Sequence, residues 1–410
     1  MILKTLFGPF VEILTMSNLS LKGPLFDDDL EIIYDGGVIV DRESIVEVGK
    51  FSKLKKKCKN VYEISSPHVL LPGFIDCHTH VCFAGSRSGE YAKKNAGISY
   101  QQILSEGGGI YDTMQKTNLA SDKELKKQTV NRLNRHFFEG VLTCEVKSGY
   151  GKDFDQEIRI LKTINEINSE NPYDLVSTCL AAHVPPNDKN ISSQDYLKSI
   201  VKDLFPQIIK DQLTNRVDIF IERNAFNINE SKQFLISAKE NGFTTTVHGN
   251  QFTSGGLKTA VDAGAISVDH LEVLSDEEIK YLSRSKTSAV VLPGCSLGLG
   301  LPFAPARKIL DAGCQLAIAT DWNPGSAPMG DLLIQASILA SNQKLTNAEV
   351  FSALSFRAAN VLNLKDRGTI EANKIADFIG FNISDYREIL YSQGKIKPTF
   401  ICKKGEVFNK

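Results

Sequence analysis

Short apolar runs rich in β-branched residues recur along the middle of the chain, and segments with helical character separate them. Runs that are apolar throughout are typical of strands buried on both faces of a parallel sheet. The runs are FIDCHTH from Phe74, VLTCEVKS from Val141, LVSTCLAAH from Leu175, VDIFIE from Val217, TTTVHG from Thr244, SVDHLE from Ser267, SAVVLPG from Ser288 and QLAIATD from Gln315. Such β/α units over roughly 250 residues predict an α/β fold, a closed TIM-like (β/α)8 barrel spanning residues 73–367.

The segments between these runs carry helix signals. Residues 154–169 place apolar side chains at helical spacing, namely Ile158, Leu161, Ile164 and Ile167. The tetrapeptides S-D-E-E from Ser275 and T-N-A-E from Thr346 are typical capping boxes, which open helices. A doubly wound open sheet is the alternative architecture, but no phosphate-binding glycine loop follows the first strand, as it usually does in such sheets.

The two ends of the chain have a different pattern. Residues 1–72 contain VEILTM, GGVIVDRESIVEVGK and NVYEISS, which alternate in polarity and turn at glycines as antiparallel strands do. Residues 368–410 contain ADFIGFN and PTFICKKGEVFNK, which have the same character. We therefore expect a second, composite domain, a small β-sandwich built from both termini.

Composition narrows the classes of protein and partner. Of the 410 residues 42% are hydrophobic and 23% charged, and 47 Lys and Arg against 48 Asp and Glu leave a net charge of −1. A nucleic-acid partner would favour a basic excess. The eight cysteines lack paired spacing and suit a reducing compartment. The N-terminus lacks the apolar core of a signal peptide, and no stretch approaches the ~18 apolar residues of a membrane span. We expect a cytoplasmic protein without nucleic-acid or membrane partners.

Histidines gather at one end of the predicted barrel. Of seven, His78 and His80 end the first strand, and the third, fifth and sixth strands end at His183, His248 and His270. Barrel enzymes build their sites at this face, from the ends of several strands. Side chains two apart on a strand point the same way, so both imidazoles of His78-Thr79-His80 can bind one ion. With His248 and Asp321, which ends the eighth strand, they would form a shell suited to zinc or ferrous iron, with room for water.

A structural explanation is the alternative for each of these residues alone. A single His-x-His recurs by chance, and an isolated buried histidine is usually a hydrogen-bonded structural residue. Five histidines at one face of a histidine-poor chain are harder to explain in that way, because burying an imidazole is costly unless it is satisfied. The combination predicts a metal site.

Longer motifs around these residues resemble one enzyme family. They are CHTHVCFAGSRSGEY, SYQQILSEGGGI, EVKSGYG, AAHVPP, VHGNQF, SVDHLE and ATDWNPGS. Together they resemble the imidazolonepropionase family within the metal-dependent amidohydrolases, over nearly the whole chain from about residue 30. EVKSGYG and TDWNPGS are far more specific than the shared His-x-His.

The resemblance implies an activity and a site. That family hydrolyses 4-imidazolone-5-propanoate to N-formimidoyl-L-glutamate with one divalent metal ion, zinc or iron, and a homodimer is expected by the same resemblance. The implied metal ligands are His78, His80, His248 and Asp321. The implied substrate residues are Arg87, Tyr150, His183, Gln251 and Ser326, with Asn323 and Gly325 near the product. Trp322 and the segment CSLGLGLPFAPARKIL from Cys295 depart from the common pattern, so we expect altered edges of the pocket.

In the expected reaction a metal-activated water attacks the ring carbonyl and the C–N bond breaks. His270 is the candidate donor to the oxyanion, or else a residue that orients the water. Many amidohydrolases carry a proton-shuttling glutamate where this chain has Gln251, and an amide cannot take that proton. Asp321 or His270 must therefore move it, and we prefer Asp321, since its second oxygen can face the water.

Other residues have narrower expected roles. Arg87 suits two parallel hydrogen bonds to the substrate carboxylate, unless it is a surface arginine. Tyr150 lies in a Gly-Tyr-Gly turn from which its hydroxyl could reach the ring, unless the turn is a simple loop.

The fourth strand lacks the lysine that bridges two ions in binuclear relatives, so we expect a single metal ion. Lys147, on the second strand, is expected to be ion-paired. Glu222 is a less favoured ligand for a second ion. Gly107–Gly109 suits a loop over the site better than a phosphate cradle.

Two other functions remain open at this level. A ring deaminase acting on guanine or cytosine would use the same metal ligands, but it would normally keep the glutamate that Gln251 replaces. The alternative that is not an enzyme is a scaffold protein that has lost its metal. The presence of all four candidate metal ligands argues against it. Metal analysis of the purified protein would separate an enzyme from a scaffold.

Overall fold

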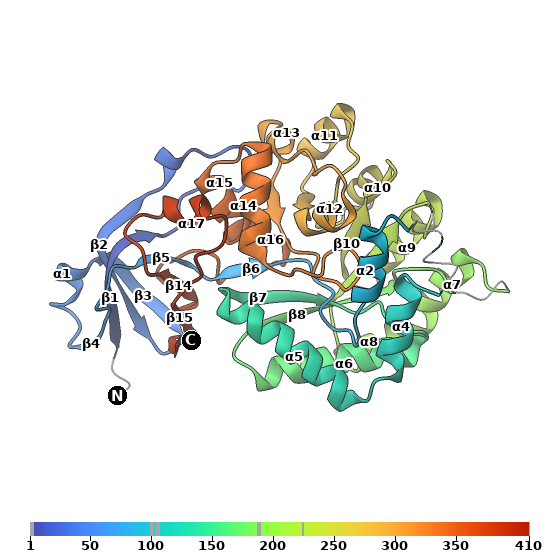
Figure 1. Cartoon of the computed structure of the whole chain (residues 1–410), viewed down its shortest axis with the longest axis horizontal. Helices are drawn as coiled ribbons and strands as arrows, with labels where there is room; N and C mark the ends of the chain where they lie inside the picture. The colour runs from blue at the N-terminus through green and yellow to red at the C-terminus, as the bar shows by residue number, and fades with distance from the viewer. Residues whose placement is uncertain (1–3, 99–101, 103–106, 187–189, 224, 410) are drawn as a thin grey trace.

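The computed structural model describes residues 4–98, 102, 107–186, 190–223 and 225–409. Two parts lie side by side along the longest axis, a barrel surrounded by helices and a separate sheet that contains both ends of the chain (Figure 1). The mixed α/β class and the two-part organisation agree with the sequence-based expectation. The boundaries at residues 72/73 and 367/368 remain a prediction.

The barrel consists of parallel strands that pair in chain order. They are β6 (Phe74–Asp76), β7 (Val141–Lys147), β8 (Asp174–Ala182), β9 (Arg216–Ile221), β10 (Thr244–Gly249), β11 (Ser267–His270), β12 (Ser288–Val291) and β13 (Leu316–Ile318). Each predicted run overlaps one of these strands, and β8 and β9 begin one residue before their runs. A doubly wound sheet would reverse its strand order at a switch point, and this sheet runs from β6 to β13 without reversal.

The first and last strands meet just beyond their carboxyl ends. The backbone N–H of Asp321 donates to His78 O at 3.0 Å, and that of His80 donates to Trp322 O at 3.0 Å. Asp76 reinforces the seam, since its carboxylate accepts from Thr320 Oγ1 at 2.6 Å and from Thr320 N at 3.1 Å. These contacts nearly close the barrel and place residues 78–80 beside residues 320–322.

Helices cover the outside of the barrel. They include α5 (Asp122–Phe138), α6 (Phe154–Glu170), α7 (Ser193–Ser199), the π-helical turn η2 (Ile200–Leu204), α8 (Phe205–Lys210), α9 (Ile228–Glu240), α10 (Gly256–Ala263), α11 (Asp276–Ser283), α12 (Pro293–Leu299), α13 (Ala306–Asp311), α14 (Leu332–Gln343), α15 (Asn347–Ala353) and α16 (Phe356–Val361). The helix predicted at residues 154–169 is α6. Both predicted capping boxes are confirmed: the Ser275 and Thr346 side chains cap α11 and α15.

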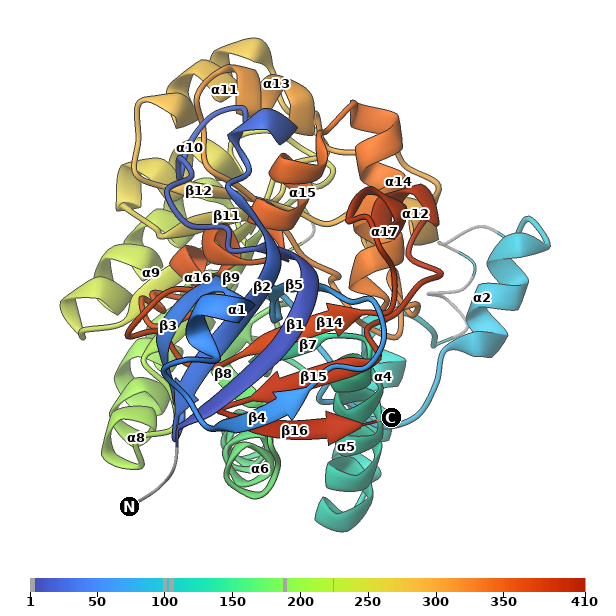
Figure 2. The same cartoon turned by 90° about the vertical axis from the view of Figure 1, so that its left-hand side faces the viewer.

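The second sheet joins strands from both termini. Its strands are β1 (Thr5–Leu14), β2 (Ile32–Asp41), β3 (Ser44–Lys50), β4 (Asn60–Glu63), β5 (Val69–Pro72), β14 (Phe378–Phe381), β15 (Phe400–Lys403) and β16 (Glu406–Asn409). One edge of the long strand β1 pairs first with β4 and then with β5, so the hydrogen-bonded sheet folds over itself (Figure 2). Tyr62 of β4 packs on Phe400 of β15 with 5.8 Å between ring centroids. The expected sandwich is thus one folded sheet enclosing an aromatic core.

The remaining short elements lie between strands within each part. They are η1 (Asp27–Asp29), α1 (Phe51–Leu54), α2 (Ser88–Asn95), α4 (Ile110–Leu119) and α17 (Arg387–Tyr391). A buried ionic cluster joins the sheet to the base of the barrel, where Lys403 Nζ lies 2.7 Å from Asp174 and 2.6 Å from Asp377. Arg367 Nη1 also contacts Asp174 at 2.5 Å. Charges of both signs therefore compensate one another at this junction.

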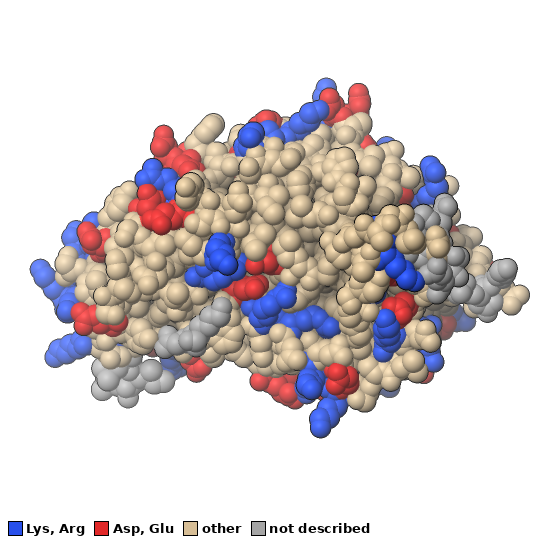
Figure 3. Space-filling view, viewed as in Figure 1, with Lys and Arg blue, Asp and Glu red and all other residues tan. Residues whose placement is uncertain are grey.

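The surface and the cysteines agree with the composition. On the face drawn in Figure 3, acidic and basic side chains are interspersed, without a large area of one sign. All eight cysteines are free and buried. Among the helices in the described parts of the chain, none is long and apolar enough to cross a membrane.

Candidate metal centre and active site

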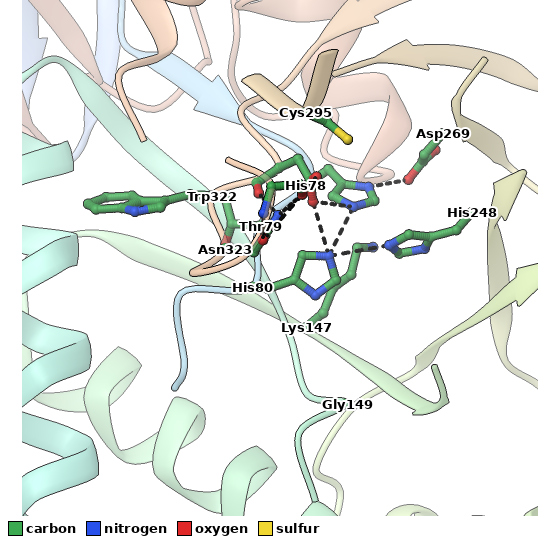
Figure 4. A network of polar contacts seen from close by, with 12 residues as sticks. His78, Thr79, His80, Lys147, Gly149, His248, Asp269, Cys295, Trp322 and Asn323 are labelled. Atoms are coloured by element: carbon green, nitrogen blue, oxygen red, sulfur yellow. Dashed lines mark hydrogen bonds and ion pairs between the residues drawn. The ribbon is translucent and has the colours of Figure 1, made fainter. Parts of the chain in front are cut away.

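Three imidazoles, those of His78, His80 and His248, converge at the seam of the barrel (Figure 4). His80 Nε2 lies 3.3 Å from His78 Nε2 and 3.3 Å from His248 Nε2. Asp321 Oδ1 lies 3.3 Å from His80 Nε2 and 3.6 Å from His78 Nε2. Zinc bonds of about 2.1 Å at tetrahedral angles separate ligand atoms by about 3.4 Å. The spacing therefore fits a single divalent ion at the centre of the group.

Carboxylates behind two of the imidazoles fix their orientation. His78 Nδ1 donates to Asp269 Oδ2 at 2.6 Å, which leaves the Nε2 lone pair facing the centre. His248 Nδ1 lies 2.8 Å from Asp218 Oδ2, and that oxygen lies 2.9 Å from the buried Lys147 Nζ. Carboxylates in this position usually set the tautomer of metal-binding histidines and raise their basicity. Lone pairs aimed at one point need a cation between them, so the residues present fit a metal ion.

The environment keeps these imidazoles neutral. Burial lowers the pKa of His80 and of His248 to about 3, and it lowers the pKa of His78 well below its ordinary value. Burial also raises the pKa of Asp321. A neutral imidazole is the form that binds a metal. In the case of Asp218 the effect of burial is outweighed by His248 and Lys147, which lower the pKa of this carboxyl group.

Two further predicted histidines and a tyrosine surround the cluster. The His183 ring stacks on His80 with 5.4 Å between centroids, and its Nδ1 lies 3.2 Å from Gly149 O, which positions it to donate there. The Tyr150 ring lies 5.9 Å from that of His183. Burial raises the pKa of the Tyr150 phenol, so it is a hydrogen-bond donor at neutral pH. His270 lies 5.3 Å from His248, measured between ring centroids.

The backbone is strained at the end of β11 and just after β13. His270 has a φ of +87° and Asp321 a φ of +53°, although neither is a glycine. Left-handed conformations of this kind cost of order 1–3 kcal/mol and cluster at functional sites. The sharp turns point both side chains toward the mouth of the barrel, where barrel enzymes place their chemistry.

Arg87 lies at the rim of the site and already has an anionic partner. Its Nε donates to Glu90 Oε2 at 3.0 Å, and its Nη2 donates to Glu90 Oε1. A Cβ placed on Gly325 would collide with Arg87 Nη1, so that nitrogen lies directly against the 323–326 loop. Glu90 also accepts from the N–H of Gly109, which precedes α4. Glu90 thus occupies the Nε–Nη2 side of the guanidinium, and Nη1 lies on the side of Gly325.

The loop after β13 brings three predicted residues together. Asn323 Oδ1 accepts from the N–H groups of Gly325 and Ser326, each at 2.8 Å. Asn323 Nδ2 donates to Asp321 O at 2.6 Å, and Ser326 Oγ donates to Asp321 Oδ2 at 3.4 Å. From the other side Gly298 of α12 packs so tightly on Ser326 O that a Cβ there would collide with it. The segment from Cys295 onward thus supports the loop of residues 323–326.

Gln251 lies where many amidohydrolases have a glutamate. Its Nε2 donates to Cys295 Sγ at 3.1 Å, so α12 holds the amide at the edge of the site. Beside it Glu272 Oε2 lies 3.6 Å from His270 Nδ1, and Ser296 Oγ donates to Glu272 Oε1 at 3.3 Å. The Glu272 carboxylate raises the pKa of His270, although burial alone would lower it.

The structure also shows the surroundings of three further residues discussed from the sequence, namely Trp322, Lys147 and Glu222. The Trp322 indole extends away from the imidazoles (Figure 4) and packs on His136 with 5.3 Å between centroids, so it does not shape the edge of the pocket. Lys147 is ion-paired as expected, at 2.7 Å from Glu145. Glu222 accepts from the N–H groups of residues 252 and 253 and supports the loop after β10 instead of facing the metal ligands.

The glycine-rich segment is described only in part. Residues 99–101 and 103–106 of the motif SYQQILSEGGGI lie outside the described residues. The N–H of Gly109 is committed to Glu90 at 2.9 Å, which does not favour a phosphate cradle. A role for this segment over the site stays a prediction.

The fold and the metal-type cluster are those of an amidohydrolase. Residues 69–407 match the model of the Amidohydrolase family, and the chain belongs to that family. Within it the chain belongs to the imidazolonepropionases. It is 35% identical over 388 residues to the imidazolonepropionase of Bdellovibrio bacteriovorus, covering 93% of this chain and 90% of the relative. It is 37% identical to that of Deinococcus radiodurans, covering 89% and 90% of the two chains.

Solved structures support the fold at lower identity. An adenosine deaminase from Xanthomonas campestris with bound zinc superposes with a TM-score of 0.73 at 16% identity, over 99% of this chain and 92% of that one. Atrazine chlorohydrolase from Arthrobacter aurescens complexed with zinc gives a TM-score of 0.71 at 14% identity, over 99% and 95%. These likenesses extend over the barrel and the terminal sheet alike.

Proposed function

We propose that this chain hydrolyses 4-imidazolone-5-propanoate to N-formimidoyl-L-glutamate, with a single divalent ion, zinc or iron, held by His78, His80, His248 and Asp321. The observation that carries the proposal is the set of contacts of 3.3–3.6 Å between ligand atoms that links these four side chains through His80, in a chain that is 35–37% identical to imidazolonepropionases. When bound, the ion would supply Lewis acidity, which lowers the pKa of a metal-bound water to about 7.

The proposed proton carrier is Asp321. Its Oδ1 faces the imidazoles of His78 and His80, while its Oδ2 receives the Ser326 hydroxyl at 3.4 Å. The second oxygen is therefore placed to accept a proton from attacking water and to pass it to the leaving ring nitrogen. Burial raises the pKa of Asp321 above its ordinary value, which makes this carboxylate a better base.

Neighbouring side chains would stabilise the charge that develops on the ring oxygen. His270 has a raised pKa because of Glu272 and can donate to an oxyanion. The rings of Tyr150 and His183 lie 5.9 Å apart and both neighbour His80, so these side chains can bind the ring of the substrate. Gln251 cannot take a proton, and we assign it to binding the ring polar groups.

Arg87 is the proposed partner of the propionate carboxylate. Glu90 occupies the Nε–Nη2 side of its guanidinium, so the substrate would use the Nη1–Nη2 edge next to Gly325. The ion pair with Glu90 orients this edge before substrate arrives, which reduces the entropy lost on binding. Asn323 and Gly325 would contact the product from the same loop.

The direct test is to add imidazolonepropionate to the purified protein and to follow the loss of its ultraviolet absorbance. Turnover should require metal, stop when a chelator strips the protein and return with one equivalent of zinc or iron. Metal-replete protein without turnover on this compound would contradict the proposal. Turnover that survives complete metal removal would contradict the metal assignment.

We further propose a homodimer in the cytoplasm, in line with the small-molecule metabolism of the family. Light scattering coupled to size-exclusion chromatography would give the mass of the particle. A mass near 45 kDa, that of one chain, would contradict the dimer.

A further inference from the structure

A second group of potential metal ligands lies next to the proposed centre, and it includes His270, the proposed oxyanion donor. It consists of His270, Glu272 and Cys295, whose ligand atoms all lie within 4.8 Å of one another. His270 ends β11 and Glu272 follows it, while Cys295 lies in the first turn of α12, directly after β12. Since β11 and β12 are neighbours in the barrel, the topology brings the three together.

Two atoms of this group are buried without a hydrogen-bond partner. They are His270 Nδ1 and Glu272 Oε2, each on a side chain that is only 3% exposed. The atoms lie 3.6 Å apart, which is within reach of an ion pair but too far for a hydrogen bond, and close to the ~3.4 Å expected between two ligands of one tetrahedral zinc. Buried polar atoms are rarely left unpaired, and an ion is one of the ordinary explanations for those that are.

The chemistry of the group favours a soft divalent ion. An imidazole nitrogen, a carboxylate oxygen and a thiolate are the side-chain ligands that zinc takes in proteins. Cys295 Sγ has the Gln251 amide as its hydrogen-bond donor, at 3.1 Å. Ser296 Oγ holds the other oxygen of Glu272 at 3.3 Å, which leaves Oε2 to face His270.

We propose that His270, Glu272 and Cys295 form a second zinc site, at which zinc in excess of the first equivalent inhibits the enzyme. The inhibition clause rests on the proposed function. An ion bound here occupies Nδ1 of His270, the proposed oxyanion donor, and draws Cys295 Sγ away from Gln251. Both effects disturb residues that face the substrate, while the four ligands of the first centre stay in place.

Cobalt titration tests the site without any need for activity. Protein loaded with one equivalent of zinc is titrated with Co²⁺ and followed by near-ultraviolet absorption, where thiolate-to-cobalt charge transfer appears. The first centre contains no thiolate, so only a site that includes a cysteine gives this band. We expect one further equivalent of Co²⁺ to bind and to produce this band. The Cys295→Ser variant should lose the band. Cys314→Ser, at another buried free cysteine, should keep it.

Activity supplies the second readout. In one-metal protein the rate should fall as free zinc rises, and Cys295→Ser should require at least ten times more zinc for the same fractional loss. Glu272→Gln keeps the thiol and should weaken cobalt binding by a similar factor, which covers a serine variant that does not fold. No second equivalent, or a second equivalent without the thiolate band, would overturn the proposal.

The two proposals can fail separately. A charge-transfer band in protein that does not turn over imidazolonepropionate would support the second site and remove the proposed function. Turnover by one-metal protein with no effect of excess zinc and no band would leave the proposed function in place and refute the second site.

Discussion

His78 Nδ1 donates to Asp269 Oδ2 across the barrel interior at 2.6 Å, a contact between residues 191 positions apart in the chain. The Ser267 hydroxyl donates to the other carboxylate oxygen at 2.7 Å, and Thr246 Oγ1 lies 3.2 Å from Oδ2. Burial disfavours charge on both partners, lowering the pKa of His78 and raising the pKa of Asp269. Asp269 therefore holds the His78 ring with its Nε2 lone pair toward the centre.

Replacing this carboxylate should weaken metal binding. In Asp269→Asn the ring of His78 loses a charged acceptor, and partners of this kind typically contribute 10- to 100-fold to metal affinity. We expect a loss of roughly that size in a competition titration with a zinc-binding dye. Asp262→Asn, on the outer helix α10, is the control and should bind zinc as the parent does. Equal affinities in the two variants would show that Asp269 does not support the metal centre.

Asp321→Asn tests the proposed proton carrier. An amide keeps the shape of the side chain and one ligand oxygen, but it cannot accept the proton from water. In protein saturated with metal we expect kcat to fall by about 10²- to 10⁴-fold, the usual contribution of a positioned base. Measuring metal content alongside kcat separates lost chemistry from lost metal. Near-normal turnover in the metal-loaded variant would exclude Asp321 as the base.

Arg87→Lys tests the substrate carboxylate partner. Lysine presents a single charged point and cannot keep the two bonds to Glu90 while offering a second edge to the substrate. Hydrogen bonds to charged groups contribute about 1.5–3 kcal/mol, so KM should rise roughly 10- to 100-fold while metal content stays the same. Arg387→Lys, at an exposed ion pair, is the matched control. An unchanged KM would refute the role.

Gly298→Ala should disturb the substrate loop from behind. An added methyl group would collide with the carbonyl oxygen of Ser326, which cannot yield without moving the turn built on Asn323. We expect a rise in KM of at least ten-fold with a smaller loss of metal, and a destabilisation of about 1–3 kcal/mol from overpacking. Gly49→Ala in β3 meets no atom within 4 Å and should change neither quantity. Parent-like kinetics for Gly298→Ala would show that the loop adapts freely.

The strands and the histidines could be predicted because their signals are local. Each barrel strand is a short apolar run, and five histidines fall at or just beyond strand ends, so the topology of a barrel suffices to bring them together. Capping boxes such as that of Ser275 are likewise readable from four consecutive residues. In these cases the residues that determine the structure are close together in the sequence, so the pattern alone predicts it.

The supporting residues could not be predicted because their signals depend on contacts. Asp218 and Asp269 stand inside apolar strands, and a buried acid there was the available hint, but nothing in the sequence says which imidazole each would meet. The pairing of Arg87 with Glu90 and the outward packing of Trp322 depend on side-chain geometry across a loop and a seam. The folded-over terminal sheet likewise depends on β1 pairing with β4 and β5 along one edge.

Acid should destabilise the junction between barrel and terminal sheet. Lys403, Lys404 and Arg367 all contact Asp174, at 2.7, 2.8 and 2.5 Å. Although burial opposes ionisation, these cations hold the pKa of Asp174 well below its ordinary value. A carboxyl group with a depressed pKa stabilises the folded state above its unfolded pKa of about 3.9, and the contribution is lost as the pH falls below that value.

Asp174→Asn should therefore lower the free energy of unfolding by about 3 kcal/mol at pH 7, because it leaves buried cations without their partner. The difference from the parent should begin to shrink as the pH drops below 4, since the unfolded parent then binds a proton at Asp174 that the folded parent does not. Urea unfolding at pH 7 and at pH 3.5 measures both values. Asp211→Asn, which breaks an exposed pair with Lys162, should cost less than about 1 kcal/mol at either pH. A pH-independent difference between Asp174→Asn and the parent would show that the Asp174 side chain contributes through shape and not through charge.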